Sequence, residues 1–178
     1  MNFKRIDQKN SLNTNPEQNF EWVALADKIY DNEIGKKVFI QLKKEKKLHV
    51  CESGWGLCGT HKIQVMHCGF DYYNEIDVAE ARELLMTAGN LYLREINDNE
   101  KIRPYLANYP FKPENIQIAI FLKNPNGSKT APEKLRVISI TDGLLRYDIG
   151  MDSLTTICEE TYDEAAAKLG TVGGSSIP

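Results

Sequence analysis

Hydrophobic residues recur at two different spacings along the chain, and these spacings predict its helices and strands. Apolar residues three or four positions apart predict three helices, over residues 15–35, 78–97 and 162–169. The first starts with an N-cap and a proline at Asn15-Pro16, and Gly35 is expected to stop it. The second has the clearest start, because Asp77 and Glu80 have the spacing of a capping box.

Alternation of apolar and polar residues predicts six strands. They cover residues 37–42, two segments beginning at residues 48 and 63, and residues 116–122, 135–140 and 145–149. The pair Asp142-Gly143 favours a tight hairpin turn between the last two strands, since both residues tolerate positive φ. The predicted order of elements is α-βββ-α-βββ-α.

This order predicts an α+β fold. Three consecutive strands with short links favour antiparallel pairing, and helices grouped on such a sheet define the α+β class. We therefore expect one domain over residues 15–170, with an antiparallel sheet packed against a long central helix at 78–97. Residues 1–14 are predicted to form a flexible arm, and residues 171–178 a flexible tail.

Length and charge narrow the functional classes. The 178 residues suffice for one hydrophobic core, and a formal net charge of -3 argues against broad nucleic-acid binding. Lysines cluster between Lys36 and Lys47, around the predicted strand at 37–42. We interpret them as charges that keep a sheet edge solvated, and the alternative is a patch for an anionic partner.

No segment predicts membrane insertion or a cofactor. No apolar run approaches the ~20 residues that cross a bilayer, and Met1–Arg5 is followed by polar residues rather than a signal core. The prediction is a cytoplasmic protein, or an exported one if a signal has been removed or a non-cleaved signal is used.

Histidine and cysteine are concentrated in one stretch, which contains all three histidines and three of the four cysteines, from His49 to Cys68. The candidate metal ligands are His49, Cys51, His61 and His67. Their spacing lacks the paired C-x-x-C elements of common zinc sites.

Strand alternation predicts that these side chains are scattered. The apolar residues that must share the core face are Leu48, Val50, Ile63 and Val65, and burying each one is worth ~1.5–3 kcal/mol. This register places His61 and His67 on the core face. It places His49, Cys51, Met66 and Cys68 on the other face. The sequence therefore favours packing roles over a metal site.

Two other hypotheses concern Cys58. A disulfide between Cys51 and Cys58 would cross the loop in an oxidising compartment. Alternatively, Cys58 as nucleophile and His61 as base would suit a hydrolase-like enzyme, but no third group that would orient the base is apparent.

The stretch Gly54–Gly59 spells G-x-G-x-x-G. In a dinucleotide-binding site this motif opens a helix, whereas here a strand is predicted to follow it. A kinase-type loop does join two strands, but the other kinase motifs are absent. We predict a flexible glycine-rich hairpin loop over residues 53–60, with phosphate binding as the alternative.

Aromatic residues in loops and near prolines are the remaining candidates for ligand binding. They are Trp55, Tyr72, Tyr73, Tyr105 and Tyr109. Aromatics near prolines commonly pack a loop over a core, and the functional alternative is a rim for a peptide or small ligand. Acidic residues between Glu159 and Glu164 are expected to start the last helix, with an acidic recognition tag as the alternative.

Residues 102–111, Ile-Arg-Pro-Tyr-Leu-Ala-Asn-Tyr-Pro-Phe, together with the strand from Ile116 and the segment 159–162, resemble a family of small uncharacterised bacterial proteins. The resemblance implies a bacterial source, and export for some of the similar proteins. It implies no activity or catalytic residue.

The sequence is best interpreted as a non-enzymatic binding or interaction module for a protein or small ligand. The alternatives are an enzyme centred on Cys58 and His61, and a secreted bacterial effector. An enzyme should have a pocket lined by Cys58 or a histidine. An interaction module should expose an apolar patch or an unpaired sheet edge.

Overall fold

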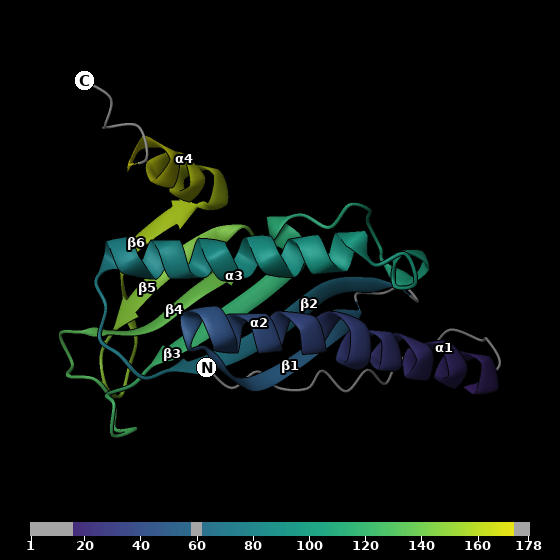
Figure 1. The fold of residues 1–178 in the computed structure, drawn as a ribbon, viewed down its shortest axis with the longest axis horizontal. Coiled ribbons are helices and arrows are strands. Elements are labelled where there is room, and N and C mark those ends of the chain that lie inside the picture. Colours follow the sequence, from purple (N-terminus) through teal and green to yellow (C-terminus); the bar gives the residue numbers. More distant parts are fainter. Residues whose placement is uncertain (1–15, 58–61, 173–178) are drawn as a thin grey trace.

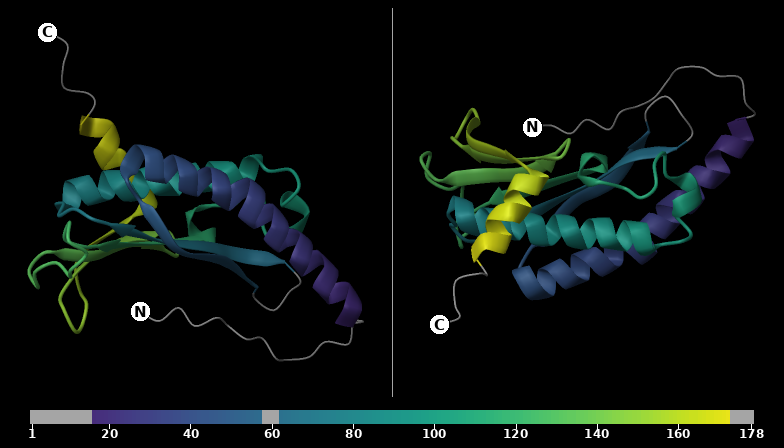
Figure 2. Two further views of the ribbon diagram at one scale, coloured as in Figure 1. Left: turned by 60° about the horizontal axis from the view of Figure 1, so that its bottom comes forward. Right: turned by 90° about the horizontal axis from the view of Figure 1, so that it is seen from above.

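A layer of helices covers one face of a six-stranded sheet (Figures 1 and 2). The computed structural model describes residues 16–57 and 62–172, so the predicted arm and tail lie largely outside it. The helices are α1 (Pro16–Ile29), η1 (Tyr30–Gly35, a π-helix), α2 (Lys36–Lys46), α3 (Val78–Asp98), the 3-10 turns η2 (Arg103–Tyr105) and η3 (Pro113–Asn115), and α4 (Tyr162–Val172). The strands are β1 (His49–Leu57), β2 (Ile63–Tyr72), β3 (Ile116–Leu122), β4 (Leu135–Thr141), β5 (Leu144–Ile149) and β6 (Thr155–Thr161).

The sheet is mixed, which corrects the expected antiparallel arrangement. The strands follow chain order, β1-β2-β3-β4-β5-β6, and every neighbouring pair is antiparallel except β2–β3. These two are parallel because the chain crosses through α3 and returns to the starting end of the sheet. The α+β class is as predicted. However, α3 shares the layer with α2 and α4, so the sheet is not covered by one central helix (Figure 2).

The predicted strand at 37–42 is wrong, because this segment belongs to α2. Gly35 does not stop the helix, since its φ of -57° is helical and the chain continues through η1 into α2. Val38 and Leu42 are buried four residues apart, whereas Ile40 between them is 59% exposed. A run of lysine, glutamine and leucine has good helix propensity, and contact with the sheet selects this spacing over alternation.

The π-helical segment is fixed to the sheet by a buried tyrosine pair. The hydroxyls of Tyr30 and Tyr92 are 2.8 Å apart, and Tyr30 donates to the carbonyl of His67 over 3.1 Å. These bonds satisfy polar groups inside the core, where an unmade bond is costly. They hold the junction of α1 and α2 against both α3 and β2.

Strong local signals were interpreted correctly. The capping box of α3 is present, with Glu80 N donating to Asp77 Oδ1 over 2.9 Å and Asp77 N donating to Glu80 Oε2 over 3.0 Å. Asp142 and Gly143 have positive φ, 52° and 75°, in the β4–β5 turn. By contrast, the acidic residues Glu159 and Glu160 lie in strand β6, which was not predicted, and α4 begins after them at Tyr162.

A buried carboxylate joins four elements on the helix side of the sheet. Glu160 of β6 is 3% exposed. It accepts hydrogen bonds from Arg82 Nε of α3 at 2.6 Å, Tyr147 Oη of β5 at 2.6 Å and Lys168 Nζ of α4 at 2.5 Å. These bonds attach β6 and α4 to the rest of the fold.

Helix α4 also packs into a gap left by a glycine in α3. A Cβ atom at Gly89 would lie 2.7 Å from Tyr162 Oη and 2.9 Å from Ile140 Cδ1. Tyr162 Oη donates to Asn90 Oδ1 over 2.9 Å in the same place. Gly89 thus lets the first residue of α4 reach the α3 surface.

None of the helices within residues 16–57 and 62–172 is long and apolar enough to cross a membrane.

Candidate functional site

The His49–Cys68 hairpin does not gather its candidate ligands. His49 and Cys51 are exposed on β1, whereas Cys68 is buried on β2 and His67 beside it is half-buried. His61 and Cys58 lie outside the described residues, as does the proposed Cys51–Cys58 disulfide. Across the described part of the chain, no group of three or more His, Cys, Asp or Glu side chains could hold a metal ion.

The predicted facing of this hairpin was wrong on β2. Met66 and Cys68 are in the core, at 0% and 2% exposure, while Val50 is 45% exposed. The pairing of β1 with β2 has two irregularities, which leave Cys51 and Gln64 without a partner position. Each extra residue reverses the alternation of side chains, so Val65 and His67 face away from the helices although Ile63 is buried.

The glycines of the G-x-G sequence have a packing role. Gly54 and Gly56 lie within strand β1, which extends through most of the predicted loop at 53–60. A Cβ at Gly54 would be 2.9 Å from the His67 ring, and one at Gly56 would be 3.1 Å from Val65. Glycine therefore leaves room for two side chains of the neighbouring strand.

The two described thiols of the hairpin, Cys51 and Cys68, have poor electrostatics for nucleophilic chemistry. Burial raises the pKa of Cys51, and Asp71 and Glu52 raise it further. Burial also raises the pKa of Cys68 well above its ordinary value. Burial lowers the pKa of His67, so this imidazole stays neutral at physiological pH. A reactive cysteine needs the opposite environment, one that stabilises the thiolate.

The predicted aromatic candidates divide into two groups at opposite ends of β2. Tyr72, at the end of β2, lines a cavity beside α2 and α3, and Tyr73 makes an edge contact with His49 at 5.5 Å between ring centroids. Trp55 lies on β1 opposite Met66, near the start of β2. Trp55 and Tyr105 both contact the same third ring.

That third ring belongs to Trp22 of α1. Its centroid is 5.9 Å from that of Trp55 and 6.0 Å from that of Tyr105, with an angle of 11° between the planes of Trp22 and Tyr105. Trp55 Nε1 donates to Asp27 Oδ1 over 2.9 Å. Arg103 lies in η2 together with Tyr105. Its guanidinium carbon is 4.4 Å from the centroid of the Tyr109 ring. We call Trp22, Trp55, Arg103, Tyr105 and Tyr109 the aromatic end.

The end of α3 positions the segment that carries Arg103, Tyr105 and Tyr109. Asn97 donates to the carbonyl of Phe111 over 2.9 Å and accepts from its N–H over 2.7 Å. Asn99 Oδ1 accepts from the N–H groups of Lys101 and Ile102, each at 3.0 Å. Two asparagines thus fix both ends of the loop.

The aromatic end contains two unpaired donors. Among the side chains that the structure describes, the buried nitrogen atoms without a hydrogen-bond partner are Trp22 Nε1 and Arg103 Nε. A buried donor with no acceptor costs about 1–3 kcal/mol, so such groups call for an explanation. Tyr109, whose ring Arg103 contacts, is 51% exposed.

Sequence reasoning missed Trp22 and Arg103. Trp22 is spaced by four and seven residues from the buried Ala26 and Ile29, so its place on the inner face of α1 could have been predicted from helical periodicity. Arg103 had no such signal, because its contact with Tyr109 depends on how the loop folds back on α3.

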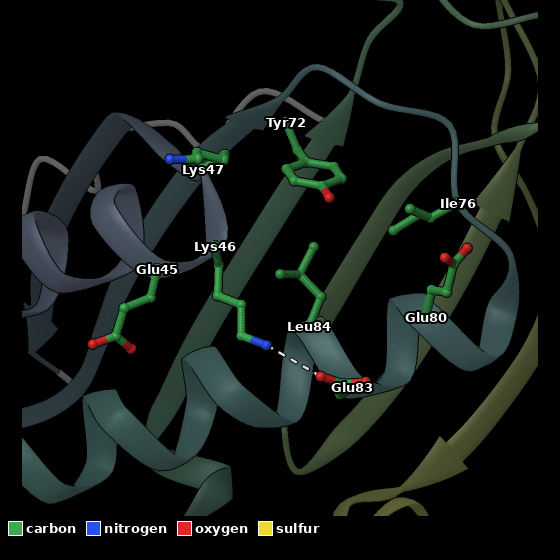
Figure 3. Close-up of a pocket in the computed structure, with 8 residues that line it drawn as sticks. All are labelled: Glu45, Lys46, Lys47, Tyr72, Ile76, Glu80, Glu83 and Leu84. Atoms are coloured by element: carbon green, nitrogen blue, oxygen red, sulfur yellow. Dashed lines mark hydrogen bonds and ion pairs between the residues drawn. The ribbon is translucent and has the colours of Figure 1, made fainter.

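Two cavities lie elsewhere, on the helix side of the sheet. One of about 270 Å³ lies between the end of α2 and the start of α3 (Figure 3). The other, of about 430 Å³, lies between the start of α3 and the β5–β6 region. None of the described residues that line either cavity is a histidine or a cysteine.

Comparison with known proteins identifies no relative. No family model matches the chain, no curated protein matches it, and no solved structure matches its fold. The resemblance to uncharacterised bacterial proteins stays a prediction.

Proposed function

We propose that this protein is a non-enzymatic interaction module that binds another protein through the aromatic end. Tryptophan, tyrosine and arginine are the residues most enriched among the energetic centres of protein interfaces. Here α1, β1 and the loop after α3 bring Trp22, Trp55 and Tyr105 into ring contact, and the same loop carries the Arg103–Tyr109 contact. Contacts between these segments already order their side chains in the free protein. Binding of a partner therefore costs little further conformational entropy.

The two unpaired donors carry the proposal. Trp22 Nε1 and Arg103 Nε are buried at the expense of folding stability, and both belong to residues of the aromatic end. Both atoms are covered in the free protein, so a partner that offers carbonyl or carboxylate oxygens would supply the missing acceptors only by displacing the side chains over them. These hydrogen bonds would form only in the complex, so they would contribute to the free energy of binding.

The alternative of a Cys/His hydrolase has less support. Cys51 and Cys68 have raised pKa values, and the described residues that line the two cavities are carboxylates, lysines and apolar groups instead of histidine or cysteine. Cys58 and His61 lie outside the described residues, so the argument from thiol pKa values concerns the other residues of the hairpin.

A photoreactive amino acid tests the surface directly. Introduced at Tyr109 in cells that naturally produce the protein, it should cross-link a discrete partner polypeptide. The same amino acid at Ser128, which is exposed on the β3–β4 loop, is the control and should give no such adduct. The Arg103→Lys change should weaken the adduct, because lysine lacks the planar fork of donors. Equal cross-linking from both positions would contradict the proposal.

Matched tryptophan substitutions should separate stability from binding. Trp22→Phe removes a donor that has no acceptor, whereas Trp55→Phe removes one that is bonded to Asp27. Since both changes lose similar ring area, Trp22→Phe should be the more stable variant by about 1–2 kcal/mol in urea unfolding. It should nevertheless lose the Tyr109 cross-link. A Trp22→Phe variant that is less stable than Trp55→Phe, or that cross-links normally, would refute the role assigned to the indole N–H.

A further inference from the structure

The two cavities are neighbours, and carboxylates line both of them. They share Ile76 and Glu80, so we treat them together as the acidic groove. Its rim carries six carboxylates, Glu45, Glu75, Asp77, Glu80, Glu83 and Glu133, against three lysines. Two of those lysines are already paired, Lys46 with Glu83 at 3.1 Å (Figure 3) and Lys134 with Glu75 at 3.5 Å.

The floor of the groove is apolar. It is formed by Ile76, Val78, Leu135, Ile149 and Ile157. Ile157 occupies a bulge in the edge strand β6 and is 51% exposed. A partner that suits this surface combines an aliphatic side chain with flanking positive charges.

The outer face of α2 has this combination. Lys36, Ile40, Lys43 and Lys44 are spaced by four, seven and eight residues, which places them on one side of the helix. Ile40 is 59% exposed. In the described part of the chain, no carboxylate lies within ion-pair distance of these three lysines.

We propose that the protein forms a two-fold dimer in which the outer face of α2 in each copy occupies the acidic groove of the other. Ile40 would meet the apolar floor, and the lysines would meet the carboxylates of the rim. The groove is lined by residues of α2, α3 and the sheet, so two copies related by a two-fold axis would make both contacts at once. Such an exchange closes on itself and stops at two copies. The dimer contact does not involve the aromatic end. The dimer proposal and the proposed function can therefore be tested independently.

Sedimentation of the full chain tests the dimer. The 20.2 kDa chain should sediment at twice its mass at micromolar concentration and about 50 mM salt. The dimer should weaken at about 500 mM salt, because salt screens the rim charges. A chain that is monomeric at every protein and salt concentration would overturn the proposal. The expected occupant of the groove would then be a basic segment of another protein.

An exposed aliphatic residue provides a matched control. Ile40→Asp should weaken dimerisation by about tenfold or more, since it places a carboxylate against an acidic rim and removes the apolar anchor. Leu25→Asp changes a similarly exposed residue (46%) on α1, outside the contact, and should dimerise like the original chain. Circular dichroism confirms that each variant is folded. Equal dimerisation of the two variants would overturn the proposal.

Charge reversal provides the decisive test. The Lys43→Glu/Lys44→Glu variant has an acidic helix face and an acidic groove, and Glu75→Lys/Glu133→Lys has a basic helix face and a less acidic groove rim. Each alone should be monomeric or weakly associated. Mixed in equal amounts, they should form heterodimers, because each helix face then meets a rim of more opposite charge. A mixture no more associated than its components would refute this pairing.

Discussion

Replacement of Glu160 by glutamine is expected to destabilise the fold by about 3–5 kcal/mol. The buried carboxylate is the common acceptor for Arg82, Tyr147 and Lys168, so its neutralisation leaves a largely buried guanidinium without its counter-charge. Removing one partner of a buried ion pair typically costs this much, even where the pair itself adds little. Urea unfolding followed by circular dichroism measures the effect, and hydrogen exchange should show α4 and β6 losing protection first.

The neighbouring residue is the matched control. Glu159 is on the same strand and pairs with Arg146 at 2.6 Å, but its side chain is 45% exposed. Because exposed ion pairs contribute about 0–1 kcal/mol, Glu159→Gln should change stability little. Similar losses of unfolding free energy from the two substitutions would show that burial does not increase the contribution of Glu160 to stability.

The same carboxylate predicts a pH dependence. Burial alone would raise the pKa of Glu160, but hydrogen bonds from Lys168, Tyr147 and Arg82 outweigh it and hold the pKa below its ordinary value. The ionised form therefore stabilises the folded state above the unfolded pKa of about 4.3, and this contribution disappears as the pH falls through the folded pKa. The stability difference between the original chain and Glu160→Gln should be largest near neutral pH and shrink in acid. A constant difference from pH 7 to pH 3 would contradict this assignment.

Substitution of Gly89 by alanine is expected to destabilise the protein by about 1–3 kcal/mol, although alanine is the better helix former. The added methyl group would lie 2.7 Å from Tyr162 Oη and 2.9 Å from Ile140 Cδ1, so the side chains of Tyr162 and Ile140 must move. Overpacking of this kind outweighs the ~1 kcal/mol that alanine gains within a helix. Thermal and urea unfolding measure the change.

Gly170 offers a control of opposite sign. It lies in α4, and among the described residues no atom is within 4 Å of the position that its Cβ would occupy. Gly170→Ala should therefore leave stability unchanged or raise it by up to about 1 kcal/mol. If both glycine substitutions stabilised the protein, the close packing of Tyr162 on α3 would be wrong.

Part of the candidate site followed from the sequence. Trp55, Tyr105 and Tyr109 were predicted as ligand-binding candidates from their place in loops, and the structure places them at one end. Tyr72 and Tyr73 were predicted with them but lie at the other end of β2. The difference could not be predicted, because it depends on which ends of β1, β2 and α3 meet.

Local signals determined the elements that have their own start and stop residues. The capping box at Asp77 and Glu80 specifies where α3 begins, and Asp142-Gly143 specifies the β4–β5 turn, since each acts through hydrogen bonds or φ angles of adjacent residues. Strand β3 was equally clear from its strict alternation.

Tertiary structure decided what those local preferences leave open. Residues 37–42 fit both a strand and a helix, and contact of Val38 and Leu42 with the core selected the helix. The extra residues Cys51 and Gln64 reversed the facing of the β1–β2 hairpin, which moved Cys68 into the core and His67 out of it. The sequence by itself determined the α+β class and the local turns. Only packing between distant segments decided the parallel β2–β3 pair, the side-chain facing and the aromatic end, because the free energy that selects them comes from burial of residues far apart in the chain.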